Sequence, residues 1–237
     1  MTTPPRSGVD PAGTGPLHFD AVLFDMDGTL VDSTASVVRS WVRLAEENGI
    51  AVQTLQAAAG HGRPARDIIA DLFAPEHRAG ALERIGRLEV GDVGDIVALP
   101  GARDALRGSG ARGAVVTSCT TGLALARQRA AGIPVPAVLV TVDDVVRGKP
   151  DPEPFLTAAS ILRVDPSRCL VVEDAPAGLA AGRAAGMTTL AVTTTHASAD
   201  LDADMVVGDL SDVRLSPSGR GVLLELLRPD QCWKSPT

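Results

Sequence analysis

Two carboxylates and a glycine lie together near the start of the chain, in the run Asp25-Met26-Asp27-Gly28-Thr29. In an extended chain, residues two apart point to the same side, so both carboxylates can face one ligand. Gly28 lets the backbone turn sharply and approach an anion closely. Neighbouring carboxylates repel each other and repel a phosphate, and a hard divalent cation held by oxygen atoms removes that repulsion. This run therefore predicts a Mg²⁺ site, with a simple turn or helix cap as the alternative.

Hydroxyl, ammonium and further carboxylate side chains follow other apolar runs of the chain. They are Thr117, Ser118, Lys149, Glu173 and Asp174. An apolar run such as Ala21–Phe24 that stops abruptly at a carboxylate is typical of a strand buried on both faces of a parallel sheet. Such sheets bind ligands beyond the carboxyl ends of their strands. The sequence therefore predicts that these side chains converge with Asp25 and Asp27 at one edge of a sheet.

Buried strands and helices are expected to alternate along most of the chain. The expected strands are Ala21–Phe24, Ala114–Val116, Ala137–Val140, Leu170–Val172 and Leu190–Val192. The expected helices between them are 121–131, 154–162 and 177–185, of which the first and last end at Gly132 and Gly186. This alternation predicts an α/β fold with a doubly wound, Rossmann-like parallel sheet.

The interval from Asp32 to about Ala98 contains only helical patterns. Ser33 or Thr34 is expected to cap a first helix that ends near Gly49, and two more helices are expected at 64–73 and 76–89. The inner face of the first helix is expected to carry Val37, Val38, Trp41, Val42 and Ala45. A helical segment inserted directly after the first strand predicts a cap over the end of that strand.

The run Leu99-Pro100-Gly101 marks the return of the chain to the core, and both ends of the chain resemble loose tails in composition. We therefore expect a disordered tail at 1–16, an α/β core formed by 17–31 and 99–228, a helical cap at 32–98 and a second tail at 229–237.

Composition excludes several classes of partner. The net charge is −7 and the pI is about 5.1, so no overall basic field attracts nucleic acid or acidic lipid. Only 3% of the residues are aromatic and none is tyrosine, which argues against a stacking platform for single-stranded nucleic acid. No apolar run approaches the length of a membrane span. We expect neither nucleic acid nor membrane as a partner, and take a monomer as the default.

The three cysteines are widely spaced and odd in number: Cys119, Cys169 and Cys232. This pattern favours neither a disulfide framework nor a metal cluster. Residues 1–16 lack the apolar segment of a signal peptide. Together these observations predict a cytoplasmic protein. Cys119 lies beside the candidate site without an activating neighbour in the sequence, so a passive role is expected.

Four motifs together resemble the signature motifs of the haloacid dehalogenase superfamily of phosphohydrolases. They are Asp25-Met26-Asp27-Gly28-Thr29, Thr117-Ser118, Gly148-Lys149-Pro150 and Glu173-Asp174, within about residues 20–215. Their spacing is similar to that of the subgroup with a helical C1 cap after the first strand. Three further segments are similar to phosphatases of sugar and polyol phosphates, such as 2-deoxyglucose 6-phosphate, hexitol phosphates or glycerol 3-phosphate: His61-Gly62-Arg63, Leu99-Pro100-Gly101 and Glu173–Gly178.

The resemblance implies roles for the carboxylates. Asp25 would attack phosphorus and become an aspartyl-phosphate. Asp27 would protonate the leaving alkoxide and then deprotonate the hydrolytic water. Mg²⁺ would bind the carboxylates of Asp25 and Asp174 and the carbonyl oxygen of Asp27. Glu173 would either bind a metal-bound water or orient Lys149.

Other roles follow from the same resemblance, and each has a simpler alternative. Lys149 would offset charge on the phosphoryl oxygens, or be an exposed lysine in a turn. Thr117 and the backbone N–H of Ser118 would hold the phosphate. Thr117 could instead cap the following helix, although Thr120 and Thr121 are better placed for that. Asp174 could likewise act only as a helix cap.

Residues 61–67 connect two of the expected helices and combine a glycine hinge with His61, Arg63 and Arg66. Such a loop suits contact with substrate hydroxyls or with a second anionic group, and a solvated turn is the alternative. In the family that the chain resembles, this stretch corresponds to the substrate-specificity loop. We expect substrate contacts from His61 and Arg63 first and from Arg66 second.

The resemblance as a whole implies a phosphoric monoester hydrolase, a Mg²⁺-dependent phosphatase of a small sugar or polyol phosphate. The similar β-phosphoglucomutases carry a histidine twelve residues after the nucleophile, where this chain has Val37, so a phosphosugar mutase is the alternative. A receiver-like phospho-ligand binder also gathers aspartate, threonine and lysine around Mg²⁺, but it lacks a helical cap. Dehalogenases need neither the second aspartate nor a metal and are disfavoured.

Overall fold

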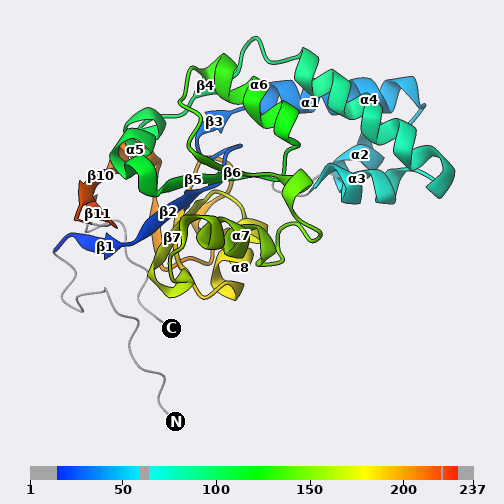
Figure 1. The fold of residues 1–237 in the computed structure, drawn as a ribbon. Helices are drawn as coiled ribbons and strands as arrows, with labels where there is room; N and C mark the ends of the chain where they lie inside the picture. Colours follow the sequence, from blue (N-terminus) through cyan, green and yellow to red (C-terminus); the bar gives the residue numbers. More distant parts are fainter. Residues whose placement is uncertain (1–14, 59–63, 220, 229–237) are drawn as a thin grey trace.

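The computed structural model describes residues 15–58, 64–219 and 221–228. A six-stranded parallel sheet lies at its centre, in the order β6-β5-β2-β7-β8-β9 (Figure 1). Its strands are β2 (Ala21–Phe24), β5 (Gly113–Val116), β6 (Val138–Val140), β7 (Cys169–Glu173), β8 (Thr188–Val192) and β9 (Met205–Val207). The predicted α/β class with a parallel Rossmann-like sheet is confirmed, and β9 is an additional strand.

Helices cover both faces of this sheet. Side chains alternate along a strand, so Val22 and Phe24 of β2 join one apolar cluster while Ala21 and Leu23 join another. The first cluster includes residues of α5 (Ala102–Ser109) and α6 (Thr121–Ala131). The second includes residues of α7 (Glu153–Leu162) and α8 (Pro176–Ala184). Burial on both faces holds the carboxyl end of β2 in a fixed place.

A second, antiparallel sheet was not predicted from the sequence. It has the order β1-β11-β10, with β1 at Leu17–Phe19, β10 at Val213–Ser218 and β11 at Gly221–Leu226. Leu17, Leu215 and Leu224 from its three strands are buried in the same cluster as α5. The core therefore extends beyond the parallel sheet.

Among the described residues between Asp32 and Val97, four α-helices pack around an apolar cluster of their own that includes Trp41, Leu44, Ile69 and Ile85. They are α1 (Thr34–Glu47), α2 (Val52–Ala58), α3 (Ala65–Leu72) and α4 (Arg78–Gly91), which lie together to one side of the sheet in Figure 1. The two short strands β3 (Val31–Asp32) and β4 (Val97–Ala98) pair antiparallel where this helical segment begins and ends. The boundaries 32–98 stay a prediction.

Several details of this helical segment differ from the expectation. Three helices were expected and α2 was missed, because only Leu55 and Ala58 of its seven residues are buried. Val38 was placed on the inner face of α1 but is 55% exposed, since it lies 100° around the helix from Val37. Ser33 occupies the N-cap position of α1, but its side chain makes no cap hydrogen bond and bonds elsewhere.

Within the described residues, no helix combines the length and the apolar character that crossing a bilayer requires. The predicted tail at 229–237 and residues 1–14 of the predicted N-terminal tail lie outside the described residues.

Candidate active site

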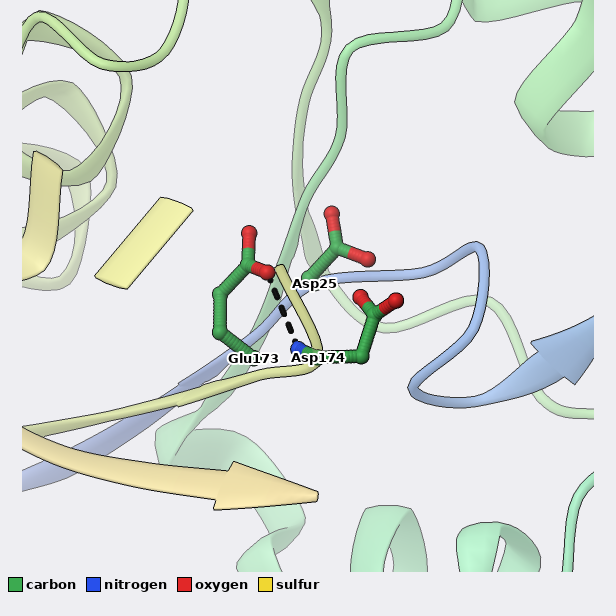
Figure 2. Close-up of side chains that lie close together, drawn as sticks. All are labelled: Asp25, Glu173 and Asp174. Carbon is green, nitrogen blue, oxygen red and sulfur yellow. Dashed lines mark hydrogen bonds between the residues drawn. The ribbon is translucent and has the colours of Figure 1, made fainter. Parts of the chain in front are cut away.

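Three carboxylates meet at the carboxyl ends of β2 and β7. These strands are neighbours, with Phe24 opposite Val172, and the N–H of Asp25 donates to the Val172 carbonyl at 2.9 Å. Asp25 follows β2 directly, Glu173 ends β7, and Asp174 comes next. All three are buried, and one oxygen of each lies within 4.8 Å of the others. Figure 2 shows the three carboxyl groups gathered at this edge of the sheet.

Lys149 is buried against the same group of carboxylates, with 3% of its surface exposed. Its Nζ donates to Asp25 Oδ1 at 2.5 Å, to Glu173 Oε1 at 2.6 Å and to the Val116 carbonyl at 3.0 Å. Burial by itself lowers the pKa of Lys149, but the charges of the two carboxylates outweigh burial and raise this pKa overall. The ammonium is therefore held charged inside the site, which excludes the alternative of an exposed turn lysine.

The described residues leave more negative charge at this edge than Lys149 alone can balance. Burial and the charge of Glu173 raise the pKa of Asp25 to about 7, although Lys149 opposes this shift. Burial and the charge of Asp25 raise the pKa of Asp174 to about 7. Crowded, buried oxygen ligands whose ionisation is suppressed in this way suit a hard divalent cation such as Mg²⁺. The predicted metal ion fits this set of donors.

Hydrogen bonds distinguish the two acidic residues at the end of β7. Glu173 Oε2 accepts the backbone N–H groups of Asp174 and Ala175, both at 3.0 Å, while its other oxygen accepts from Lys149. Asp174 accepts hydroxyl hydrogen bonds from Thr29 and Thr195. The N-cap of α8 is Ala175 without any side-chain cap bond, so Asp174 does not act as a helix cap. Glu173 is placed to orient Lys149, and Asp174 is placed to face a ligand beside Asp25.

Gly28 packs directly against Asp174 and has φ of +87°. A Cβ at this position would lie 2.3 Å from Asp174 Oδ2, too close for any contact. We expect Gly28→Ala to move this carboxylate and to weaken Mg²⁺ binding by about tenfold or more. Gly49 is the matched control, because its φ of +63° is also left-handed but its Cβ would meet open space.

Both variants should be compared by Mg²⁺ titration calorimetry and by urea unfolding. Backbone strain of about 1–2 kcal/mol is common to the two, so only Gly28→Ala should change the Mg²⁺ affinity. Equal affinities in both variants would show that Asp174 does not bind the metal.

The carboxylate of Asp27 lies in a network of its own. Its Oδ1 accepts from Ser33 Oγ at 2.7 Å and pairs with Arg127 Nη1 at 2.8 Å, and its Oδ2 accepts from Cys119 Sγ at 3.0 Å. Burial and the charge of Asp27 raise the pKa of the Cys119 thiol, which agrees with the predicted passive role of this cysteine. Sequence reasoning missed Arg127. Its spacing could have indicated burial, because Arg127 shares a helix face with Leu123 and Ala131 at i,i+4 spacing, but it does not indicate Asp27 as the partner.

The two hydroxyl residues after β5, Thr117 and Ser118, line a cavity that Asp25 and Asp174 also line. Thr117 is buried, and its Oγ1 accepts the Cys119 N–H at 3.2 Å. Thr120 caps α6 by accepting the Leu123 N–H, so the alternative of Thr117 as the helix cap is wrong. Thr117 and Ser118 both line the cavity, and their predicted contacts with phosphate stay predictions.

A cavity of about 390 Å³ joins the sheet edge to the helical segment. From the sheet side it is lined by Asp25, Asp27, Thr117, Ser118, Glu173 and Asp174, and from the helices α1, α3 and α4 by Val37, Trp41, Ile68, Leu82, Ile85 and Glu89. Arg66 also lines it, but it is exposed and donates to the Val146 carbonyl at 3.3 Å. His61 and Arg63 lie outside the described residues, so their predicted substrate contacts stay predictions.

Comparison with known proteins points to one family. The family model described as haloacid dehalogenase-like hydrolase matches residues 19–186. Hexitol phosphatase A of Escherichia coli is 37% identical, over 84% of this chain and 95% of its own. Validoxylamine A 7'-phosphate phosphatase of Streptomyces hygroscopicus is also 37% identical, over 83% and 96%. The crystal structure of a hydrolase from Pseudomonas syringae matches 81% of this chain and 94% of its own, with 25% identity and a TM-score of 0.71.

The cavity geometry, the fold and these similarities agree with the resemblance of the four motifs. The chain belongs to the haloacid dehalogenase-like hydrolases.

Proposed function

We propose that this chain is a Mg²⁺-dependent phosphatase that hydrolyses a small sugar or polyol phosphate through an aspartyl-phosphate on Asp25. The observation that carries the proposal is the convergence of Asp25, Lys149 and Asp174, of which the two carboxylates line a cavity of about 390 Å³. A nucleophile held by a charged ammonium beside a candidate metal site is the arrangement that phosphoryl transfer requires.

In the first half-reaction, an oxygen of Asp25 forms a bond to phosphorus while the bond to the leaving alkoxide breaks. Asp27 must enter this step as the protonated carboxylic acid, and it gives its proton to that alkoxide and becomes the carboxylate. Lys149 offsets charge on the phosphoryl oxygens, and Thr117 with the N–H of Ser118 holds them. Bound at Asp25, Asp174 and the Asp27 carbonyl, Mg²⁺ would neutralise charge on the carboxylates and the phosphoryl group. Glu173 keeps Lys149 in place.

In the second half-reaction, Asp27 as a carboxylate removes a proton from water, and the water oxygen attacks phosphorus. The bond from phosphorus to Asp25 breaks, so inorganic phosphate leaves and both aspartates return to their starting states. The same group acts as acid and then as base, which requires it to lie beside both the leaving oxygen and the incoming water.

The cavity and the relatives support the proposed substrate class. About 390 Å³ accommodates a small phosphate ester, and Trp41 on the wall opposite the sheet offers an apolar face to the carbon skeleton. The names of the relatives specify a hexitol phosphatase and a phosphatase of validoxylamine A 7'-phosphate. We accordingly propose a hexitol-, cyclitol- or sugar-derived alcohol as the leaving group. We also propose a monomer as the default and a cytoplasmic location, for which the free thiols of Cys119 and Cys169 are suited because the cytoplasm is reducing.

The test is phosphate release from a panel of hexose, hexitol, cyclitol, pentose and glycerol phosphates with Mg²⁺. Turnover should stop on addition of EDTA and return with excess Mg²⁺, and substrates should be ranked by kcat/KM. Glucose 1-phosphate distinguishes the mutase alternative, because a mutase yields glucose 6-phosphate and a phosphatase yields free phosphate. Val37, which replaces the mutase histidine, lines the cavity and supports hydrolysis. Turnover that is unaffected by EDTA would refute the metal-dependent mechanism.

Mg²⁺ affinity is expected to depend on pH. Asp25 and Asp174 each have a pKa of about 7, so at pH 6 both hold protons that the cation must displace. Affinity should fall by about tenfold or more from pH 8 to pH 6. Calorimetric titration in buffers of different ionisation enthalpy should show proton release on binding. An affinity that is constant over this range would mean that these carboxylates are not the ligands.

A further inference from the structure

A chain of buried charges joins Asp27 to the helical segment above the sheet. Arg127 on α6 pairs through Nη1 with Asp27 at 2.8 Å, and its Nη2 donates to Glu89 Oε1 at 3.1 Å. The Arg127 side chain is 3% exposed and that of Glu89 is 10% exposed. Glu89 lies near the end of α4, so one guanidinium bridges a residue of the sheet edge and a residue of the inserted helices.

Stability alone does not account for this bridge. Removing charges from water is costly, and apolar residues of similar volume are often as stabilising as a buried ion pair. Arg127 shares its helix face with Leu123 and Ala131, so an apolar residue would suit the position. Its Nε, moreover, has no hydrogen-bond partner in the part of the chain that the structure describes. A charged guanidinium therefore occupies this position although one of its buried N–H groups is left without a partner.

Asp27 is linked to both ends of the helical segment, to one directly and to the other through Arg127. Ser33, at the start of α1, donates directly to Asp27 Oδ1, while Glu89 reaches the same oxygen through Arg127. Helices α1 and α4 lie side by side in Figure 1. Asp27, Arg127 and Glu89 all line the cavity where the leaving group would lie. The position of this carboxylate therefore depends on where α1 and α4 sit.

We propose that Arg127 is a positioning residue for Asp27, and that Glu89 makes this positioning conditional on the docking of α4 against α6. The inference rests on the proposed function, in which Asp27 transfers the proton to the leaving group. With α4 docked, the guanidinium is fixed from two sides and holds the Asp27 carboxyl group, through Oδ1, beside the leaving oxygen in both its protonated and its ionised form. With α4 displaced, Arg127 loses one partner and Asp27 loses its fixed position. Proton transfer is thus coupled to closure of the cavity, which also excludes water.

The first test compares leaving groups in Arg127→Met and Glu89→Leu. A polyol alkoxide needs a proton to leave and p-nitrophenolate does not, so misplacement of the acid should affect only the former strongly. We expect kcat for the preferred polyol phosphate to fall by about 10- to 100-fold. The first turnover of p-nitrophenyl phosphate, seen as a burst of p-nitrophenolate, should keep its rate within about threefold. Arg127→Lys should restore part of the loss.

A second arm uses an Asp27→Asn background. Once the acid is absent, Arg127→Met should reduce turnover by less than about twofold further, because the two residues act as one unit. A purely structural role predicts instead that Arg127→Met slows the reactions of the polyol phosphate and of p-nitrophenyl phosphate equally. It also predicts a lower melting temperature in both the wild-type and the Asp27→Asn background, and a full additional loss of turnover in Asp27→Asn. Either equal loss or no loss for the polyol phosphate overturns the proposal.

The third arm needs no turnover. Hydrogen exchange of the Leu30 and Val31 amides reports the loop that carries Asp27, since both donate to the Met26 carbonyl. Glu89→Leu should accelerate their exchange by about tenfold. Arg84→Gln is the control, because it removes an exposed pair with Glu47 within the helical segment. If the wild-type chain releases no phosphate but Glu89→Leu accelerates exchange, the proposed function fails and the coupling stands. If the wild type is active and exchange is unchanged, the coupling alone is rejected.

Discussion

Asp25→Asn is expected to lower phosphate release by about 10⁴-fold or more, because an amide cannot form the bond to phosphorus. Asp25 is the carboxylate to which Lys149 Nζ donates at 2.5 Å, and it lies at the base of the cavity. The variant should also fail to become phosphorylated. Acid quenching during turnover, followed by mass spectrometry of the intact chain, measures this directly.

Asp20→Asn is the matched control for that variant. Asp20 directly precedes β2, whereas Asp25 directly follows it. The Asp20 carboxylate pairs with the partly exposed Arg168 at 2.6 Å and does not line the cavity. Its loss should change turnover by less than about twofold, since surface ion pairs contribute about 1 kcal/mol or less. Activity of Asp25→Asn within tenfold of wild type would remove Asp25 from the role of nucleophile and leave metal-activated attack by water.

Lys149→Met is expected to destabilise the protein by about 3–5 kcal/mol, because it leaves Asp25 and Glu173 buried without their shared cation. Turnover should fall by about 10²- to 10³-fold, the effect of losing one donor to the transition state. Urea unfolding at a fixed Mg²⁺ concentration measures the first effect. Arg39→Met, which removes exposed pairs with Asp92 and Asp95, should change stability by about 1 kcal/mol or less.

The stability deficit of Lys149→Met should shrink on acidification. Burial and Glu173 raise the pKa of Asp25 to about 7, while Lys149 lowers it, so removing Lys149 raises this pKa further. A carboxyl group with a raised folded-state pKa destabilises the fold above that pKa and ceases to do so as it is protonated. The difference from wild type should therefore narrow between pH 8 and pH 5. If the stability difference between Lys149→Met and wild type stays constant over this pH range, repulsion between Asp25 and Glu173 is not the cause of the lost stability.

The central sheet could be predicted from the sequence because its strands are buried on both faces. Val22, Leu23 and Phe24 all lie inside the core, which gives an uninterrupted apolar run. The antiparallel strands could not be found in this way. β1 has only three residues, and in β11 the buried residues do not alternate strictly with exposed ones. The pairing that defines these strands is with segments far away in the sequence.

Some residues of the candidate site could likewise be predicted from the sequence, and others could not. Asp25, Lys149 and Asp174 each follow a strand, and the geometry of a parallel sheet brings strand ends together without further information. Arg127 and Glu89 lie in the middle and near the end of helices, and nothing local marks them as partners of Asp27. Their proximity depends on how α4 packs on α6, which no periodicity within either helix specifies.

The pairing of β3 with β4 makes the helical segment between them exchangeable. Val31 lies opposite Ala98, and the Leu99 N–H donates to the Leu30 carbonyl at 3.0 Å, so the chain enters and leaves the helical segment at adjacent points. A short turn could bridge these points, and a foreign lid could be grafted there without disturbing the sheet. A graft that lacks an acceptor for Arg127 should fold and bind phosphate, yet turn over alcohol esters poorly.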